Sequence, residues 1–124
     1  MRLISGSKRT TRWLLVAACA IVIFGFSSLP GSAIPGSVAD YSPVAHFVEY
    51  AVLGGLVVFA LGPRGFVLRF ALLALLVCSL YAVSDEFHQS FTPGRTPDPV
   101  DWATDTIGAG VAIAALTITR RRRS

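Results

Sequence analysis

Charged residues are scarce in this chain. Only 15% of its 124 residues are charged, whereas 53% are apolar, and the mean hydropathy is +0.63. A soluble bundle with so little polar surface would expose large apolar patches and would aggregate. At this length the chain forms one domain at most. The scarcity of charge therefore excludes an ordinary soluble domain.

Cysteine is also scarce, and sequence-local metal motifs are absent. The two cysteines, Cys19 and Cys78, lie inside apolar runs and have no ligand-like spacing. We therefore expect packed free thiols, and neither a disulfide nor a thiolate metal site. The sequence contains no HExxH motif, internal repeat or low-complexity segment.

Four long apolar runs are present instead. Each is long enough for a helix to cross a bilayer core of about 30 Å at about 1.5 Å per residue. The sequence therefore predicts an all-α fold, an integral membrane bundle of four transmembrane helices, at about residues 13–29, 44–61, 66–89 and 100–119. The first run is expected to remain as a membrane anchor, because no good signal-peptide cleavage site follows it.

Basic residues lie almost entirely on one side of this four-helix arrangement. By the positive-inside rule, the N-terminal segment 1–12, the C-terminal segment 120–124 and the middle turn are cytoplasmic, in a multi-pass protein of the cell membrane. The basic C-terminus can contact anionic lipid head groups of the bilayer, and no nucleic-acid partner is expected. The oligomeric state is left open. The basic residues on this side are Arg2, Lys8, Arg9, Arg12, Arg64, Arg69, Arg120, Arg121, Arg122 and Arg123.

The acidic residues fall on the other side. Most of them lie in the polar segment from Ser84 to Asp105, between two apolar runs, and Asp40 and Glu49 lie near the same predicted surface. Ionisable groups at membrane depth are functional candidates by default. The sequence therefore predicts a site at the outer leaflet.

Helical spacing places these polar residues on shared faces. At about 1.5 Å per residue, Glu49, Asp85 and Asp105 each lie roughly 8–9 Å below the outer loops. We expect the faces to meet in a pocket open to the outside, with Arg95 as a counter-charge paired with Asp98 or another aspartate. The shared faces hold His46 with Glu49, then Asp85 with His88 and Gln89, and then Asp98 with Asp101 and Asp105.

The residue types leave several chemistries open. Candidate catalytic residues are Glu49, Asp85, His88 and Asp101, and candidate binding residues are His46, Glu86, Gln89, Arg95, Asp98 and Asp105. They could bind a divalent metal such as zinc, perform acid–base chemistry on a lipid-linked envelope substrate, or carry a proton or cation. The alternative is a hydrogen-bond network that only fixes the helix ends. Glu86 could equally face head-group water, and Asp98 could serve only as a helix N-cap.

Part of the chain resembles the VanZ-like family of membrane proteins, which is named after a teicoplanin resistance protein. The resemblance covers about residues 44–110, and the family pattern usually has Asn where this chain has Asp105. The resemblance implies an envelope protein, and some relatives lower susceptibility to glycopeptide antibiotics. The matching residues are His46, Glu49, Tyr50, Leu53 and Gly54, the run Asp85-Glu86-Phe87-His88-Gln89-Ser90-Phe91-Thr92-Pro93-Gly94-Arg95, and Asp98, Asp101 and Gly108.

The functional expectation is therefore a VanZ-like membrane protein with an outward-facing polar site. That site would bind or act on an envelope lipid or glycan precursor and affect glycopeptide susceptibility. The alternatives are a small proton- or cation-coupled transporter and a non-enzymatic membrane scaffold. Whether the protein is an enzyme is left open.

Overall fold

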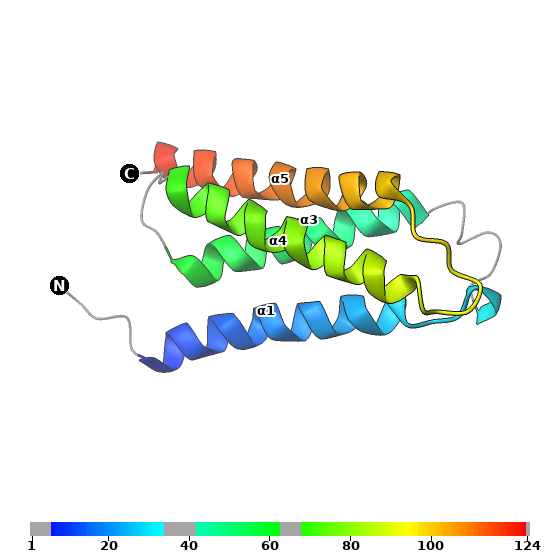
Figure 1. Cartoon of the computed structure of the whole chain (residues 1–124). Coiled ribbons are helices and arrows are strands. Elements are labelled where there is room, and N and C mark those ends of the chain that lie inside the picture. Colours follow the sequence, from blue (N-terminus) through cyan, green and yellow to red (C-terminus); the bar gives the residue numbers. More distant parts are fainter. Residues whose placement is uncertain (1–5, 34–41, 63–67, 124) are drawn as a thin grey trace.

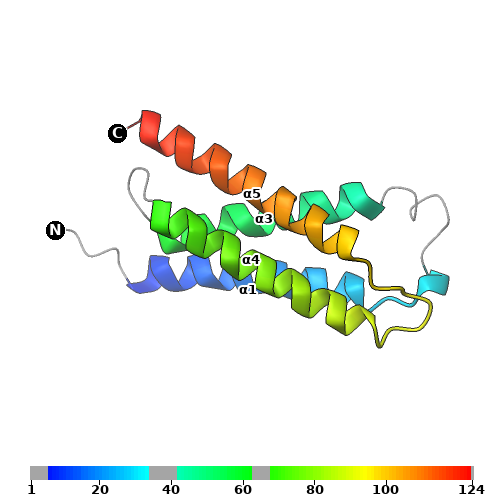
Figure 2. The same ribbon diagram turned by 45° about the horizontal axis from the view of Figure 1, so that its top comes forward.

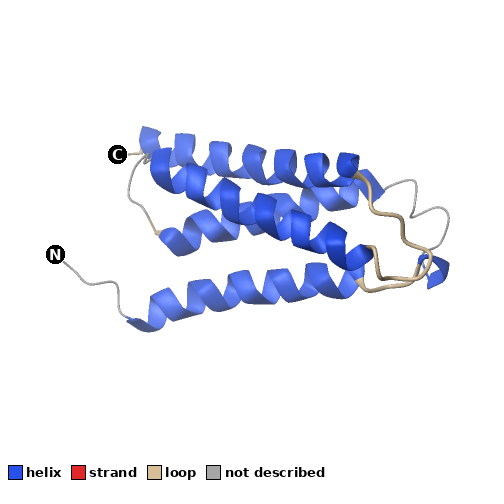
Figure 3. Ribbon diagram, viewed as in Figure 1, coloured by secondary structure: helices blue, strands red, loops and turns tan. Residues whose placement is uncertain are grey.

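The computed structural model describes residues 6–33, 42–62 and 68–123. Within these ranges the chain forms helices and loops and no strand (Figure 3), which confirms the predicted all-α class. The helices are α1 (Gly6–Ser27), the short 3-10 helix η1 (Gly31–Ala33), α3 (Ser42–Leu61), α4 (Leu68–Gln89) and α5 (Pro99–Arg122).

The four long helices are each long and apolar enough to cross a membrane. Their outer faces expose large apolar side chains such as Leu72, Leu76 and Val83 on α4, as expected of surfaces that meet lipid rather than water. The chain is therefore a multi-pass membrane protein. Helix α1 begins at Gly6, earlier than the predicted span, because its basic first turns contain no helix breaker and long side chains can extend to the polar head groups.

The helices form one bundle (Figures 1 and 2), and the buried side chains at its centre are mostly apolar. Helices α3 and α5 run parallel and share the most extensive contact, α4 packs against both, and α1 packs mainly against α3. The core contains small or branched side chains such as Val57, Ala74 and Ile113, together with the free thiol of Cys78. Cys19 is also a free thiol, so the prediction of two unpaired cysteines is confirmed.

Glycines allow α3 and α5 to approach closely. A Cβ atom added to Gly108 would lie 2.4 Å from the carbonyl oxygen of Phe47, and one added to Gly54 would lie 2.9 Å from that of Ala109. Both values are too short for a real side chain, so the backbones are in direct contact at these points. Small residues such as Gly54 and Gly108 are typical of helices that pack this closely.

The two ends of the bundle differ in charge. The start of α1 and the end of α5 lie at one end of the bundle, which we call the terminal end. The opposite end holds the last turns of α1 and α4, the loop 90–98 and the first turns of α3 and α5 (Figure 1). The terminal end holds Lys8, Arg9, Arg12, Arg69 and the basic end of α5. Arg2, Asp40, Arg64 and most of the predicted middle turn lie outside the described residues.

Candidate functional site

His46 and Asp105 form the first part of the candidate site. Their side chains come from α3 and α5, 59 positions apart, and His46 Nδ1 lies 2.9 Å from Asp105 Oδ1. Asp105 is 0% exposed and His46 is 6% exposed. The contact between Phe47 and Gly108 explains the pairing, because it fixes the two helices next to each other one residue after His46 and one turn after Asp105.

Asp85 of α4 completes a three-helix cluster. Its carboxylate is 2% exposed, and its Oδ2 accepts a hydrogen bond of 3.3 Å from the hydroxyl of Tyr50. His46, Asp85 and Asp105 each offer one ligand-type atom, and these three atoms all lie within 4.8 Å of one another. We call this group the HDD cluster.

Three buried carboxylate oxygens at this end of the bundle have no partner. Asp85 Oδ1, Asp105 Oδ2 and Glu86 Oε1 find no hydrogen-bond donor among the described residues. Nearly all buried polar atoms in folded proteins are paired, and an unpaired buried oxygen costs free energy. The site therefore has spare acceptor capacity that a proton, water, cation or polar ligand could satisfy.

Glu86 and Asp98 meet at the start of α5. Glu86 is 9% exposed, and its Oε2 accepts a hydrogen bond of 2.9 Å from the backbone N–H of Asp98. The alternative in which Glu86 faces head-group water is therefore wrong. Asp98 is exposed, and its Oδ1 accepts the N–H of Val100 at 2.9 Å, which is the geometry of a helix N-cap.

His88 and Gln89 face α1 rather than the HDD cluster. The Ser28 hydroxyl donates to Phe24 O at 2.7 Å and lies 2.9 Å from His88 Nε2. Because a hydroxyl has one proton to donate, His88 Nε2–H is the donor in the second contact. The His88 ring also stacks on Phe24 at 4.1 Å between centroids, and Gln89 Nε2 donates to Ser27 Oγ at 3.3 Å.

Among the described residues Arg95 does not form the predicted ion pair with an aspartate, although its charge still acts on Glu49. Within the described part of the chain it forms no ion pair with Asp98; its Nη1 lies 3.5 Å from the carbonyl oxygen of Leu29. The loop that carries Arg95 is held against the end of α1, because Gly31 N–H donates to Pro93 O at 2.9 Å. Helical geometry explains this position, since the loop follows the α4 face that already contacts α1.

Glu49 and Asp101 are half-buried and border the cluster. On α3 the side chain that joins Asp85 and Asp105 is that of His46, whereas Glu49 lies about 60° around the helix from it. The expected convergence of all the polar residues in one pocket is thus only partly found. Asp85, Asp105 and His46 come together. His88 and Gln89 contact the end of α1 instead, and Arg95 contacts the loop just after it, at Leu29.

Three contributing residues were not singled out from the sequence. Tyr50 is 0% exposed and donates to Asp85, although it was noted from the sequence only as a residue that matches the family pattern. Its position one turn after His46, on the same helix face, was the available signal. Ser27 and Ser28 supply the α1 contacts to Gln89 and His88, and a pair of serines at the end of an apolar run gave little indication of a partner.

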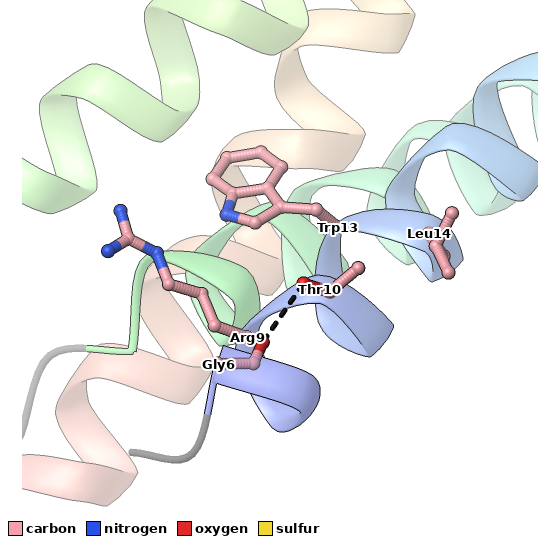
Figure 4. Close-up of a pocket in the computed structure, with 5 residues that line it drawn as sticks. All are labelled: Gly6, Arg9, Thr10, Trp13 and Leu14. Carbon is pink, nitrogen blue, oxygen red and sulfur yellow. Dashed lines mark hydrogen bonds between the residues drawn. The ribbon is translucent and has the colours of Figure 1, made fainter. Parts of the chain in front are cut away.

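A shallow surface pocket lies at the opposite end of the bundle (Figure 4). It is lined by Gly6, Arg9, Thr10, Trp13 and Leu14. Thr10 Oγ1 donates to Gly6 O at 2.9 Å, so its hydroxyl is used within α1. None of the lining residues is a carboxylate or histidine, and the pocket is separate from the HDD cluster.

Comparison with known proteins identifies a family. The model of the VanZ/LLP1 family matches residues 12–120 of the chain, so the match includes α3, α4 and nearly all of α5. No curated protein matches the chain, and no solved structure matches it.

Proposed function

The chain belongs to the VanZ/LLP1 family, and from this premise we propose that it binds a lipid or glycan component of the cell envelope at the outer face of the cell membrane. Binding there would change the susceptibility of the host to glycopeptide antibiotics. The observation that carries the proposal is the group of unpartnered, buried carboxylate oxygens of Asp85, Glu86 and Asp105 at one end of the bundle.

The chemistry of the site indicates the kind of ligand. Unpartnered carboxylate oxygens are acceptors, so an organic ligand that meets them directly would donate hydrogen bonds to them. Sugar hydroxyls, amide N–H groups and ammonium groups of envelope precursors are donors of this kind. An isolated phosphate would be repelled, because the carboxylates carry the same sign of charge and Arg95 is directed to the carbonyl oxygen of Leu29.

The outer location is supported by the distribution of charge. Lys8, Arg9 and Arg12 lie in the first turns of α1, and Arg69 lies in the first turn of α4. These two helix starts lie at the end of the bundle opposite the loop 90–98 (Figure 1). Basic residues near helix ends are retained on the cytoplasmic side. With the termini inside, the HDD cluster and the loop 90–98 are at the outer side.

Transport across the membrane is less well supported. From the HDD cluster toward the termini, the buried core consists of apolar side chains such as Leu53, Val57 and Ile113. The buried hydroxyl of Thr117 donates within its own helix, to Ile113 O at 2.8 Å. A proton or cation pathway needs polar groups along its length, and the described core places its carboxylates at one end.

Glycopeptide susceptibility tests the proposal. The chain is expressed in a teicoplanin-sensitive host, and the lowest inhibitory concentration is compared for wild type, Asp85→Asn and Thr117→Val. Thr117 is a matched control, because it is also a buried polar residue but lies at the other end of α5. We expect wild type and Thr117→Val to change susceptibility equally and Asp85→Asn to have no effect, at equal amounts of membrane-inserted protein.

Two results would contradict this function. In the first, wild type leaves susceptibility unchanged and retains no lipid or glycan precursor on purification from the host membrane. In the second, Asp85→Asn changes susceptibility as much as wild type does, which would separate the activity from the buried carboxylates.

A further inference from the structure

We propose that the HDD cluster is a binding site for one divalent transition-metal ion of the zinc class. The three ligand-type atoms of His46, Asp85 and Asp105 lie within 4.8 Å of one another. Ligands of a tetrahedral zinc ion, at bonds of about 2.0–2.1 Å, lie about 3.3–3.4 Å apart. The three side chains would therefore move closer together when an ion binds, and the His46 nitrogen that now contacts Asp105 at 2.9 Å would coordinate the ion instead.

The unpartnered oxygens are the independent observation that points to a ligand. Asp85 Oδ1 and Asp105 Oδ2 have no hydrogen-bond donor in the described structure, and their residues are 2% and 0% exposed. The second oxygen of each carboxylate is already engaged, by Tyr50 and His46 respectively. Each of the two clustered aspartates thus keeps one acceptor atom free for a cation.

Charge balance also fits a divalent ion. Buried charges are stable only when they are paired or coordinate a metal. Two carboxylates and one neutral imidazole around a divalent cation give a site with no net charge, which suits a cluster within a membrane bundle. One nitrogen and two oxygen ligands suit zinc and similar first-row ions, whereas calcium and magnesium prefer oxygen ligands alone.

The surroundings of the cluster resemble those of a metal site. Ligating carboxylates are commonly held by a further hydrogen bond, and the Tyr50 hydroxyl supplies one to Asp85. The three ligands come from three helices, two of which are in direct backbone contact at Gly108 and Phe47. Three protein ligands leave the fourth position of a tetrahedral ion open. Water, or an atom with a lone pair from a bound envelope component, could occupy that position.

The alternative explanation is that a proton, and not a metal ion, neutralises the HDD cluster. One proton on Asp85, an internal water and an imidazolium paired with Asp105 would also satisfy and neutralise the cluster. This arrangement binds no metal, so metal content separates the two explanations. Metal content is measured on purified protein, without host cells or an antibiotic. A negative result would therefore overturn the metal proposal alone and would leave the proposed function to its own test.

The test is metal binding by the full chain purified in detergent without a polyhistidine tag. After removal of metals with a chelator, the protein is dialysed against micromolar Zn²⁺, and bound zinc is measured by elemental analysis. We expect about one zinc per chain for wild type and for Thr117→Val. His46→Ala and Asp105→Asn are expected to lose it, and Tyr50→Phe to weaken affinity about 10–100-fold.

A second measurement guards against unfolded variants. Co²⁺ is added to the metal-free wild-type protein, and the visible absorption of a four-coordinate site is recorded, then reversed by added Zn²⁺. Absence of both zinc and the Co²⁺ spectrum in folded wild type would overturn the proposal in favour of the proton. Undiminished zinc in His46→Ala and Asp105→Asn would overturn it by placing the metal elsewhere.

Discussion

Two acidic side chains at the start of α5, those of Glu86 and Asp98, accept hydrogen bonds from backbone N–H groups. Among the described residues neither side chain forms an ion pair. Glu86 accepts the backbone N–H of Asp98, and Asp98 accepts that of Val100. These donors would otherwise have no partner within α5, because the first N–H groups of a helix have no acceptor inside it. Both carboxylates also lie at the positive end of the helix dipole. They explain why α5 begins at Pro99 within a polar loop.

The N-cap of α5 gives a prediction for Asp98. Replacing Asp98 by Ala removes the acceptor of the Val100 N–H and is expected to lower the free energy of unfolding by about 1 kcal/mol. Asp98→Asn keeps an acceptor of the same shape and is expected to change stability by only a few tenths of a kcal/mol. Thermal unfolding in detergent measures both. Equal losses for the two variants would show that the Asp98 charge, and not the cap, matters.

For single residues, the sequence predicted which polar side chains belong to the site better than it predicted their hydrogen-bond partners. Spacing placed Asp85 and Asp105 at a similar depth, and the structure brings both of them to His46. It did not identify Tyr50 as a donor or His88 as a contact of α1, because a residue's partner depends on how neighbouring helices are rotated. Helical periodicity describes one helix and contains no information on that rotation.

Helix α3 carries the site because of its close approach to α5. Gly108 allows α5 to contact the α3 backbone at Phe47. About two turns further along α3, Gly54 allows a second contact, with the α5 backbone at Ala109. These two contacts fix the parallel register of the helices. The HDD cluster depends on that register, since His46 and Asp105 lie directly beside the first contact.

Two neighbouring glycines on α5 give a prediction for this interface. Gly108→Ala would place a Cβ atom 2.4 Å from Phe47 O, so the helices must separate, at a cost of about 1–3 kcal/mol. Gly110→Ala is the matched control, because its Cβ would meet Leu75 Cδ1 at an ordinary 3.7 Å. We expect thermal unfolding to show a clear loss for the first variant and little change or a small gain for the second. Similar behaviour of the two variants would show that the tight contact is unimportant.

The long helices themselves were predictable, and their packing was only partly so. Apolar runs of membrane length indicated all four transmembrane helices, and glycines such as Gly54 and Gly108 are typical of close packing. The extension of α1 back to Gly6 was missed, because hydropathy falls at Lys8 although nothing there breaks the helix. The contacts of α1 with Gln89 and His88 were missed because that run looked uniformly apolar.

At the scale of the whole molecule, opposite charges gather at opposite ends. The starts of α1 and α4 and the end of α5 are basic, and they lie at one end of the bundle, opposite the loop 90–98 (Figures 1 and 2). The HDD cluster is near the end that holds this loop. Arg12 of α1 also contacts α3 at the basic end through a cation–π interaction, because its guanidinium lies 4.3 Å from the centroid of the Phe59 ring. This arrangement predicts a single orientation in the membrane.

Cysteine labelling tests that orientation. In a background with Cys19→Ala and Cys78→Ala, a cysteine is introduced at exposed Thr96 in the outer loop or at exposed Arg123 after α5. A membrane-impermeant maleimide is expected to label Thr96→Cys in intact cells and to label Arg123→Cys only after permeabilisation. The reverse pattern would place the acidic site in the cytoplasm and would rule out an extracellular envelope ligand.

The account as a whole depends on the contact between His46 and Asp105, which joins distant parts of the chain at the centre of the site. A double-mutant cycle with His46→Ala and Asp105→Ala, measured by unfolding of metal-free protein in mixed micelles, tests it directly. Each single change leaves a buried group without its partner, so we expect the double variant to lose less stability than the sum of the two, by about 0.5–3 kcal/mol. Additive losses would show that the two residues do not interact and that α3 and α5 do not build this site.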